Sequence, residues 1–314
     1  MVLLLQYTLI FSSVLILVAL GGCFAEHSGV INLGLEGIMV LGALGGALVM
    51  RYFGDSISGA ALVLLVLLGS VLFGVVYSTL LGVASINFKA DQTLVGTAMN
   101  LLGTAGATVI VKAINTAANP DDVSSAIQYA TPKTAFIVNI GKFEFNWFML
   151  IAFIAIIFAW VTLYKTRFGL RLMACGEHPQ AADSVGINVY KMRYAGVLIS
   201  GFLGGVGGLA YTLAAGSGFN SDVGGYGFLA LAVMIFGNWK PLPILGASLF
   251  FALFKVIAAL NATLTFLPKF EGVKEISNFY QMLPYIVTMI VLIFTSKNSQ
   301  APKAEGIPYD KGSR

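Results

Sequence analysis

Hydrophobic residues gather in long runs along this chain, separated by short polar segments. The runs cover residues 3–22, 35–51, 58–88, 92–114, 146–165, 194–216, 225–238, 241–260 and 283–296. Most have about the twenty-residue length that an α-helix needs to cross a roughly 30 Å hydrocarbon core. They lack the apolar–polar alternation of a transmembrane β-strand. The pattern predicts an all-α polytopic membrane protein with eight to ten spans.

Three of these segments are irregular. Residues 58–88 would form a helix about 46 Å long at 1.5 Å per residue, so this helix must tilt or project from the membrane. Residues 225–238 are too short to cross comfortably, which indicates a broken or re-entrant helix. Residues 23–34 are too polar and glycine-rich for a lipid-facing helix, yet spans flank them closely. We expect broken helices at the last two places.

The composition agrees with a membrane protein. Of the 314 residues, 58% are hydrophobic and 10% are charged, whereas soluble domains carry about 25% charged residues. The net charge of +4 comes mostly from loops and the C-terminal tail. It therefore indicates how the chain is oriented in the membrane and does not indicate nucleic-acid binding. With two cysteines, Cys23 and Cys175, a disulfide framework or a metal site is not expected.

Basic residues set the expected orientation. The loop 165–193 holds five basic and two acidic residues between two apolar spans, and an excess of Lys and Arg marks cytoplasmic loops. Lys89, the turn 238–240 and the tail 297–314 are placed on the same side. The loops 115–145 and 261–282 then lie outside, and the side of the N-terminus stays open. We expect one permease-like membrane domain, 1–296, with a cytoplasmic tail, 297–314.

The 165–193 loop has the features of a folded docking surface. Gly176, Pro179 and Gly186 punctuate a short helical stretch, Gln180 to Val185. A plain tether between two spans does not need these punctuating residues. The loop is therefore our first candidate for a surface that binds a partner.

A second candidate is the polar segment from Glu26 to Gly37. Ionisable side chains at membrane depth are unfavourable by about 2.5–3.5 kcal/mol and usually face a cavity or a partner. Glycines let the backbone leave helical geometry where protein or water covers it. We interpret the segment as the lining of a polar translocation path. Alternatively, it is a loop at the membrane surface with solvated Glu26 and Glu36.

Other polar residues lie within or beside spans. Asn100, Asn220 and Asp222 are further candidates for the path. Asn100 could equally form a hydrogen bond between helices, which is common in membranes. Lys255 is expected to extend its side chain to the outer interface.

Two repeated patterns concern glycine. Ser28-Gly29-Val30-Ile31-Asn32 and Ser217-Gly218-Phe219-Asn220 both precede a span, and interrupted helices at matching places of two halves mark binding sites in transporters. Unrelated glycine-rich turns can look alike, so the internal repeat is a hypothesis. Small residues four apart indicate close helix packing. These pairs are Gly42 with Gly46, Gly201 with Gly205, and Gly204 with Gly208.

Several catalytic motifs are missing from the sequence. There is no GxxxxGK[ST] phosphate loop, so we expect the chain itself to hold neither ATP nor Mg²⁺. HExxH, GxSxG and CxxC are also missing, and the two histidines, His27 and His178, lie far apart in sequence. An intramembrane enzyme is therefore disfavoured.

The chain resembles the branched-chain amino acid/sugar-type permeases of bacterial ABC importers, and most closely their simple-sugar and nucleoside subgroup. The resemblance extends over nearly the whole chain. It rests on the segments Ser28–Gly37, Gly176–Asn188 and Leu231–Pro241, which appear in the expected order, and on Ala90–Asn100. Cys175 and Met173 stand where this family has less sulfur and more charge.

The resemblance implies a type II importer fold in the bacterial cell membrane, without an ATPase of its own. A cytoplasmic ATP-binding subunit that binds ATP and Mg²⁺, a second permease chain forming a heterodimer, and an extracytoplasmic binding protein would complete the transporter. The loop that matches Gly176–Asn188 carries the family's coupling helix. This implies ATPase-coupling roles for Gly176, Glu177, His178, Pro179, Ala181, Ala182, Asp183 and Gly186.

The expected function is the import of a nucleoside or simple sugar. Few fixed charges line the candidate path, made of Glu26, Asn32, Glu36, Asn100, Asn220 and Asp222, which suits a neutral polyhydroxyl solute. Two alternatives remain: a branched-chain amino acid permease of the same class, and an ion-coupled transporter that works alone and uses Glu26 and Glu36 as ion sites.

Overall fold

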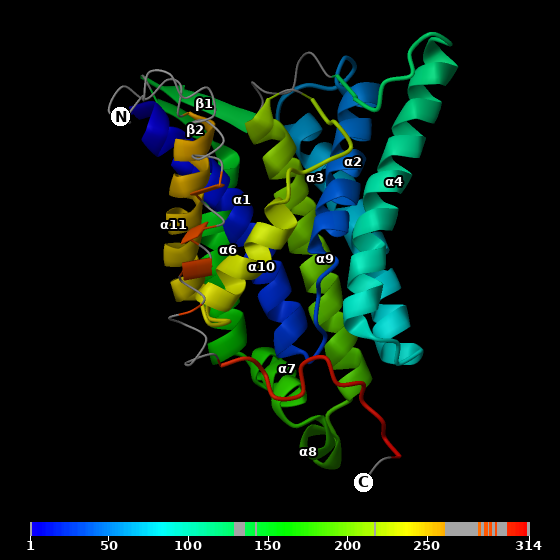
Figure 1. The fold of residues 1–314 in the computed structure, drawn as a ribbon, viewed down its shortest axis with the longest axis vertical. Coiled ribbons are helices and arrows are strands. Elements are labelled where there is room, and N and C mark those ends of the chain that lie inside the picture. The colour runs from blue at the N-terminus through cyan, green and yellow to red at the C-terminus, as the bar shows by residue number, and fades with distance from the viewer. Residues whose placement is uncertain are drawn as a thin grey trace.

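The computed structural model describes residues 2–128, 136–141, 143–216, 218–260 and 300–312, with isolated positions between 282 and 293. These residues form a bundle of long helices with one small hairpin (Figure 1). Within the described ranges, seven helices are long and apolar enough to cross a membrane. They are α1 (Val2–His27), α2 (Leu35–Phe53), α3 (Gly59–Gly82, extended by a π-helical turn Val83–Asn87), α4 (Gln92–Ala118), α6 (Trp147–Lys165), α9 (Val189–Ala215) and α11 (Pro241–Ala259).

The all-α polytopic fold is thereby confirmed. The predicted long helix over 58–88 is one continuous element down to Asn87. The strands are β1 (Ile137–Ile140) and β2 (Phe143–Asn146), which pair antiparallel. The loop 261–282 and most of the predicted span 283–296 lie outside the described residues.

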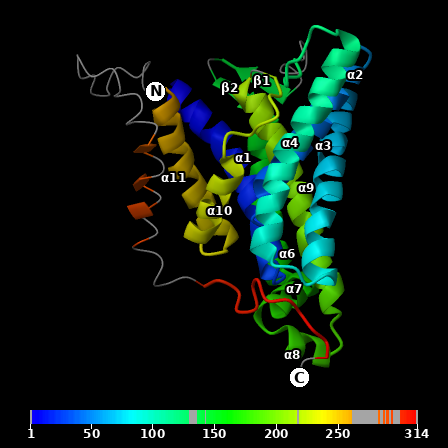
Figure 2. The ribbon, with the colours of Figure 1, turned by 45° about the vertical axis from the view of Figure 1, so that its right-hand side comes forward.

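The two ends of the bundle differ in charge. The short helices α7 (Arg167–Glu177) and α8 (Pro179–Ser184) lie at one end with residues 300–312, whereas the hairpin and the start of α1 lie at the other (Figures 1 and 2). Lys89 belongs to the α7–α8 end, where it pairs with Asp310 at 3.1 Å. The basic residues of the α7–α8 loop make this end cytoplasmic. Since α1 starts at the opposite end (Figure 1), the same rule predicts that the N-terminal end of α1 lies outside.

Glycines form the contact between α2, α3 and α9. A Cβ atom at Gly42 would come within 2.3 Å of the Cα of Gly205, and one at Gly208 within 2.0 Å of the carbonyl oxygen of Met39. Gly74 of α3 meets Gly205 in the same way. Backbones that approach this closely gain dispersion contacts along their length. The predicted role of the small-residue pairs in helix packing is confirmed.

The helices differ in how much surface they keep for the lipid. Within the most apolar stretch of 18 residues in each helix, 72% of the residues are buried in α2 and in α9. The corresponding share is 22% in α3 and 33% in α6. Hence α2 and α9 form the centre of the molecule, while α3 and α6 present apolar side chains outward.

Two helices are broken as predicted. Helix α1 continues to His27, so residues 23–27 are helical and the predicted break at 23–34 is shorter than expected. Residues 28–34, called the first break here, lead to α2 at Leu35. After α9, residues 218–225, called the second break here, turn back and lead to α10 (Tyr226–Phe236). The 11 residues of α10 are too few to cross a bilayer. Gly29 and Gly218 both adopt positive φ angles, of 91° and 84°, which an L side chain rarely adopts. The two glycine-containing motifs therefore share a backbone feature.

Candidate functional site

Glu36 joins the two broken helices. It lies in the first turn of α2, and its Oε1 and Oε2 accept hydrogen bonds from the backbone N–H of Gly225 (2.8 Å) and Gly227 (2.6 Å) at the start of α10. The first amides of a helix have no partner within the helix. A carboxylate placed between two helix N-termini also offsets their partial positive charges. Glu36 therefore fixes the start of α10 against the start of α2.

Asn100 holds the start of α2 from the other side. Its Oδ1 accepts from Gly37 N–H at 2.9 Å, and its Nδ2 donates to the Leu33 carbonyl at 2.8 Å. Both ends of the side-chain amide are used between α4 and the first break. This is the interhelical hydrogen bond that the sequence left as an alternative to solute contact.

Asn32 is fully buried in the first break. Its Nδ2 donates to Ser200 Oγ of α9 at 2.7 Å, and its Oδ1 accepts from Gly34 N–H at 3.1 Å. The neighbouring Ile31 N–H donates to Gln92 Oε1 at 2.6 Å. Side chains from α4 and α9 thus satisfy the polar groups of this extended segment.

Asn220 and Asp222 lie in the second break and are exposed. The backbone around them pairs with the outer loop, because Phe219 and Ile127 exchange hydrogen bonds of 2.8 and 3.0 Å. Ser221 Oγ also donates to the Ser125 carbonyl at 2.8 Å. The second break therefore presents polar side chains to the surroundings, which the first break does not.

Glu26 is buried at the cytoplasmic end of α1. Trp239 Nε1 donates to its Oε2 at 2.5 Å, and His27 Nε2 bonds the Trp239 carbonyl at 2.8 Å. The carboxyl groups of Glu26 and Glu305 interact electrostatically, and burial raises the pKa of Glu305. Glu26 thus links α1, the α10–α11 turn and the C-terminal segment.

The predicted coupling loop folds into α7 and α8 outside the bundle (Figure 1). Pro179 occupies the first position of α8, where its missing N–H is not needed. Gly176 packs on the His27 carbonyl, which a Cβ atom would approach to 2.3 Å. Ala182 is buried beside Cys175.

The other loop residues lie on the surface. The exposed residues are Glu177, His178, Ala181 and Gly186, and Asp183 is half-buried. One face of this loop therefore anchors it to the bundle, and the other is available to a partner.

Residues 300–312, named the C-terminal strap here, cross the cytoplasmic ends of the helices (Figure 2). Ala304 N–H donates to the Gly176 carbonyl at 2.8 Å, and the buried Arg193 donates through Nη1 to the Ile307 carbonyl at 3.0 Å. The Tyr309 ring packs edge-on against Tyr190 at 5.4 Å. The strap therefore connects α7 and α9.

The sequence did not identify several residues that hold these sites together. They are Ser200, Trp239, Arg193 and Glu305. Arg193 had a visible signal, since it is a charge at the start of an apolar span. Ser200, Trp239 and Glu305 had none, because their partners lie 168, 213 and about 280 positions away in the chain.

The sequence was compared with known proteins. Residues 4–295 match the family described as branched-chain amino acid transport system / permease component. The guanosine ABC transporter permease protein NupQ of Bacillus subtilis is 43% identical over 98% of this chain and 96% of its own length. The nucleoside ABC transporter permease protein NupC of Lactococcus lactis is 41% identical over 96% of this chain and 95% of its own.

A second Lactococcus lactis protein, the nucleoside ABC transporter permease protein NupB, is 26% identical over 76% of this chain and 67% of its own length. No solved structure matches the chain. The family match spans nearly all of the sequence, and the helices that could cross a membrane fall inside it. This chain is therefore a multi-pass membrane protein that belongs to the family of branched-chain amino acid transport system permease components.

Proposed function

We propose that this chain is the membrane permease of an ATP-driven importer of nucleosides. The observation that carries the proposal is the identity of 41–43% to a guanosine and a nucleoside permease over almost the full length of all three chains. The second break agrees with a neutral, hydrogen-bonding solute. Asn220 is exposed there beside one exposed carboxylate, Asp222, while the carboxylate of Glu36 is taken up by Gly225 and Gly227.

Energy is supplied by a separate cytoplasmic ATPase that binds ATP and Mg²⁺. The exposed face of the α7–α8 loop, with Glu177, His178 and Ala181, is the proposed contact. Movement of this loop reaches the bundle through Gly176, which packs on the end of α1. Thus the permease needs no covalent chemistry of its own.

A second permease chain and an extracytoplasmic binding protein complete the proposed transporter. Two permeases of one organism, NupB and NupC, are both similar to this chain, which favours a pair of unequal permeases. The binding protein would deliver the solute to the outer end, where Asn220 and Asp222 are exposed.

Uptake into proteoliposomes tests the proposal. The complete transporter should accumulate labelled guanosine when ATP is present on the cytoplasmic side, and an excess of unlabelled adenosine or cytidine should compete. Competition by leucine alone would replace the proposal by an amino acid permease. Accumulation by this chain alone, driven by an ion gradient, would replace it by a secondary transporter.

ATPase docking is tested separately by co-purification. Glu177→Arg combined with Ala181→Trp alters the exposed face only, and it should abolish recovery of the ATPase with the permease. Ala182 is unsuitable for this purpose, because it is buried and its enlargement would disturb the fold. Asp121→Arg, an exposed change at the opposite end, is the matched control and should leave ATPase recovery unchanged. Equal recovery with both variants would place the docking surface elsewhere.

A further inference from the structure

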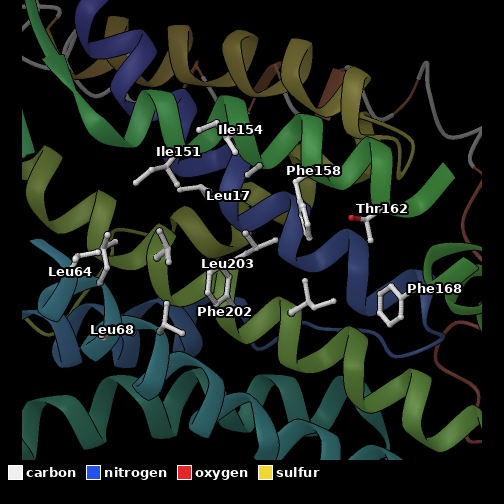
Figure 3. A pocket seen from close by; sticks show the side chains of 15 residues that line it. Leu17, Leu64, Leu68, Ile151, Ile154, Phe158, Thr162, Phe168, Phe202 and Leu203 are labelled. Carbon is white, nitrogen blue, oxygen red and sulfur yellow. The ribbon is translucent and has the colours of Figure 1, made fainter. Parts of the chain in front are cut away.

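A long apolar groove runs along the outside of the bundle between α1, α3, α6 and α9. Figure 3 shows side chains from these four helices pointing into one space, among them Leu17, Leu68, Phe158 and Phe202. Its volume is about 920 Å³, and Thr162 is the single polar residue among those that line it.

Water is a poor occupant for this groove. A bound water needs two to four polar partners, and the lining offers a single hydroxyl, that of Thr162. Empty space is also unfavourable, since the lining atoms lose dispersion contacts on that side. The groove therefore suits an apolar occupant.

The groove opens toward the hydrocarbon of the membrane. Leu64, Leu68 and Phe158, all in its lining, are 60–63% exposed, and they belong to α3 and α6, of whose most apolar stretches only 22% and 33% are buried. Along α6, the lining residues Ile151 to Thr162 cover about 16 Å at 1.5 Å per residue. This is close to half of a roughly 30 Å hydrocarbon core, the depth of one leaflet.

The cytoplasmic end of the groove is basic. Phe168 of α7 lines this end, and Arg171 lies three residues further along the same helix, so the two share a face. Arg167 and Lys165 stand beside them, and all three basic side chains are exposed. No Asp or Glu occurs between residues 147 and 176. Basic pockets between transmembrane helices on the cytoplasmic side bind anionic lipid headgroups.

We propose that this groove is a binding site for one anionic phospholipid of the inner leaflet. An acyl chain lies between α3, α6 and α9, and the phosphate pairs with Arg167 and Arg171. The site is independent of the transported solute. It is also next to the coupling loop, because Gly169 of α7 packs directly on the carbonyl of Thr162 at the end of α6. A lipid bound here stabilises the junction between α6 and α7, from which α7 and α8 extend.

Native mass spectrometry of the assembled transporter tests the headgroup. The transporter is equilibrated in micelles that contain phosphatidylglycerol and phosphatidylcholine in equal amounts. We expect retention of phosphatidylglycerol over phosphatidylcholine, weakened by about fivefold for each arginine replaced in Arg167→Gln and Arg171→Gln. Lys240→Gln, an exposed basic change on the α10–α11 turn, is the control and should retain the wild-type ratio. Equal retention of both lipids by the wild type overturns the proposal.

A second pair of variants tests the groove itself. Ala155→Trp places an indole in the lining, so it should displace the lipid; Ile157→Trp, on the exposed face of the same helix, should not. A melting curve confirms that both variants are folded. Equal lipid retention by both would overturn the groove assignment. Cross-linking of Phe158→Cys to the second permease chain would also overturn it, since the occupant would then be a protein helix.

Discussion

The two helix breaks of this permease look alike in sequence, but the structure uses them differently. Both contain a glycine with positive φ, Gly29 or Gly218, and both lead into a helix that starts inside the bundle. In the first break, Ser28 and Asn32 are fully buried and bonded to protein groups. In the second, Asn220 and Asp222 are exposed.

This difference gives the two breaks different roles: the first supports neighbouring helices, and the second exposes polar groups. The side chains of the first break satisfy the backbone, so they position α2 and, through Glu36, the start of α10. The second break, held by that support, is where polar groups are accessible. We infer that changes in the first break act mainly on stability and changes in the second mainly on uptake.

The largest effect is expected at Glu36. In Glu36→Ala the N–H groups of Gly225 and Gly227 lose a charged acceptor, and each such bond contributes about 1.5–3 kcal/mol. We expect a large loss of thermal stability in detergent, together with loss of uptake. Glu36→Gln keeps one oxygen acceptor and should recover about half of the lost stability. If Glu36→Ala melts like the wild type, Glu36 does not hold α10.

A smaller effect is expected at Asn100. Asn100→Ala removes the two bonds to Gly37 and Leu33, and interhelical polar bonds in membranes contribute about 0.6–1.7 kcal/mol. The melting temperature should fall less than in Glu36→Ala, and the apparent KM for guanosine should stay at the wild-type value. Thr97→Ala, an exposed change one turn earlier on α4, is the control. A raised KM with an unchanged melting temperature would instead place Asn100 in the solute path.

The second break should respond in the opposite way. Asp222→Asn alters an exposed side chain, and surface changes usually stay within about 0.5 kcal/mol. We therefore expect a wild-type melting curve with reduced guanosine uptake. Asp121→Asn, in the outer loop, serves as the control and should leave both properties unchanged. A lowered melting temperature with normal uptake would give the second break a supporting role as well.

Much of this architecture could be predicted from the chain because it depends on local properties. Span lengths, the short α10 and the helix-packing glycines follow from runs of apolar and small residues. The cytoplasmic face of the α7–α8 loop follows from its basic residues. Each of these features is set by residues close together in sequence. The span lengths, the short α10 and the helix-packing glycines are confirmed by the structure, whereas the side of the α7–α8 loop stays a prediction.

The pairing of polar groups could not be predicted. The sequence predicts Glu36, Asn32 and Asn100 as path residues because buried polar groups in membranes are unfavourable. That argument indicates that each has a partner, but it does not distinguish a solute from the protein. The structure gives all three protein partners: α10, α9 and the first break. Nothing in the sequence indicates that Trp239, in a polar turn, or Glu305, in a basic tail, interacts with Glu26 of α1.

The smallest effect on stability is expected from single cysteine substitutions, which allow the two breaks to be compared by thiol labelling. Val30→Cys places a small apolar thiol in the first break, where the side chain is fully buried, and Asn220→Cys places one in the exposed second break. The native thiols give little background, since Cys23 and Cys175 are buried and burial raises the pKa of Cys175 to about 11. An exposed thiol with a pKa of about 8.5 is roughly a tenth ionised at pH 7.5. A membrane-impermeant maleimide added from outside should therefore label Asn220→Cys at least about tenfold faster than Val30→Cys, because a buried site reacts only when the protein opens locally. Equal rates in the two breaks would mean that the first break also opens to solvent, and its residues would return to the solute path.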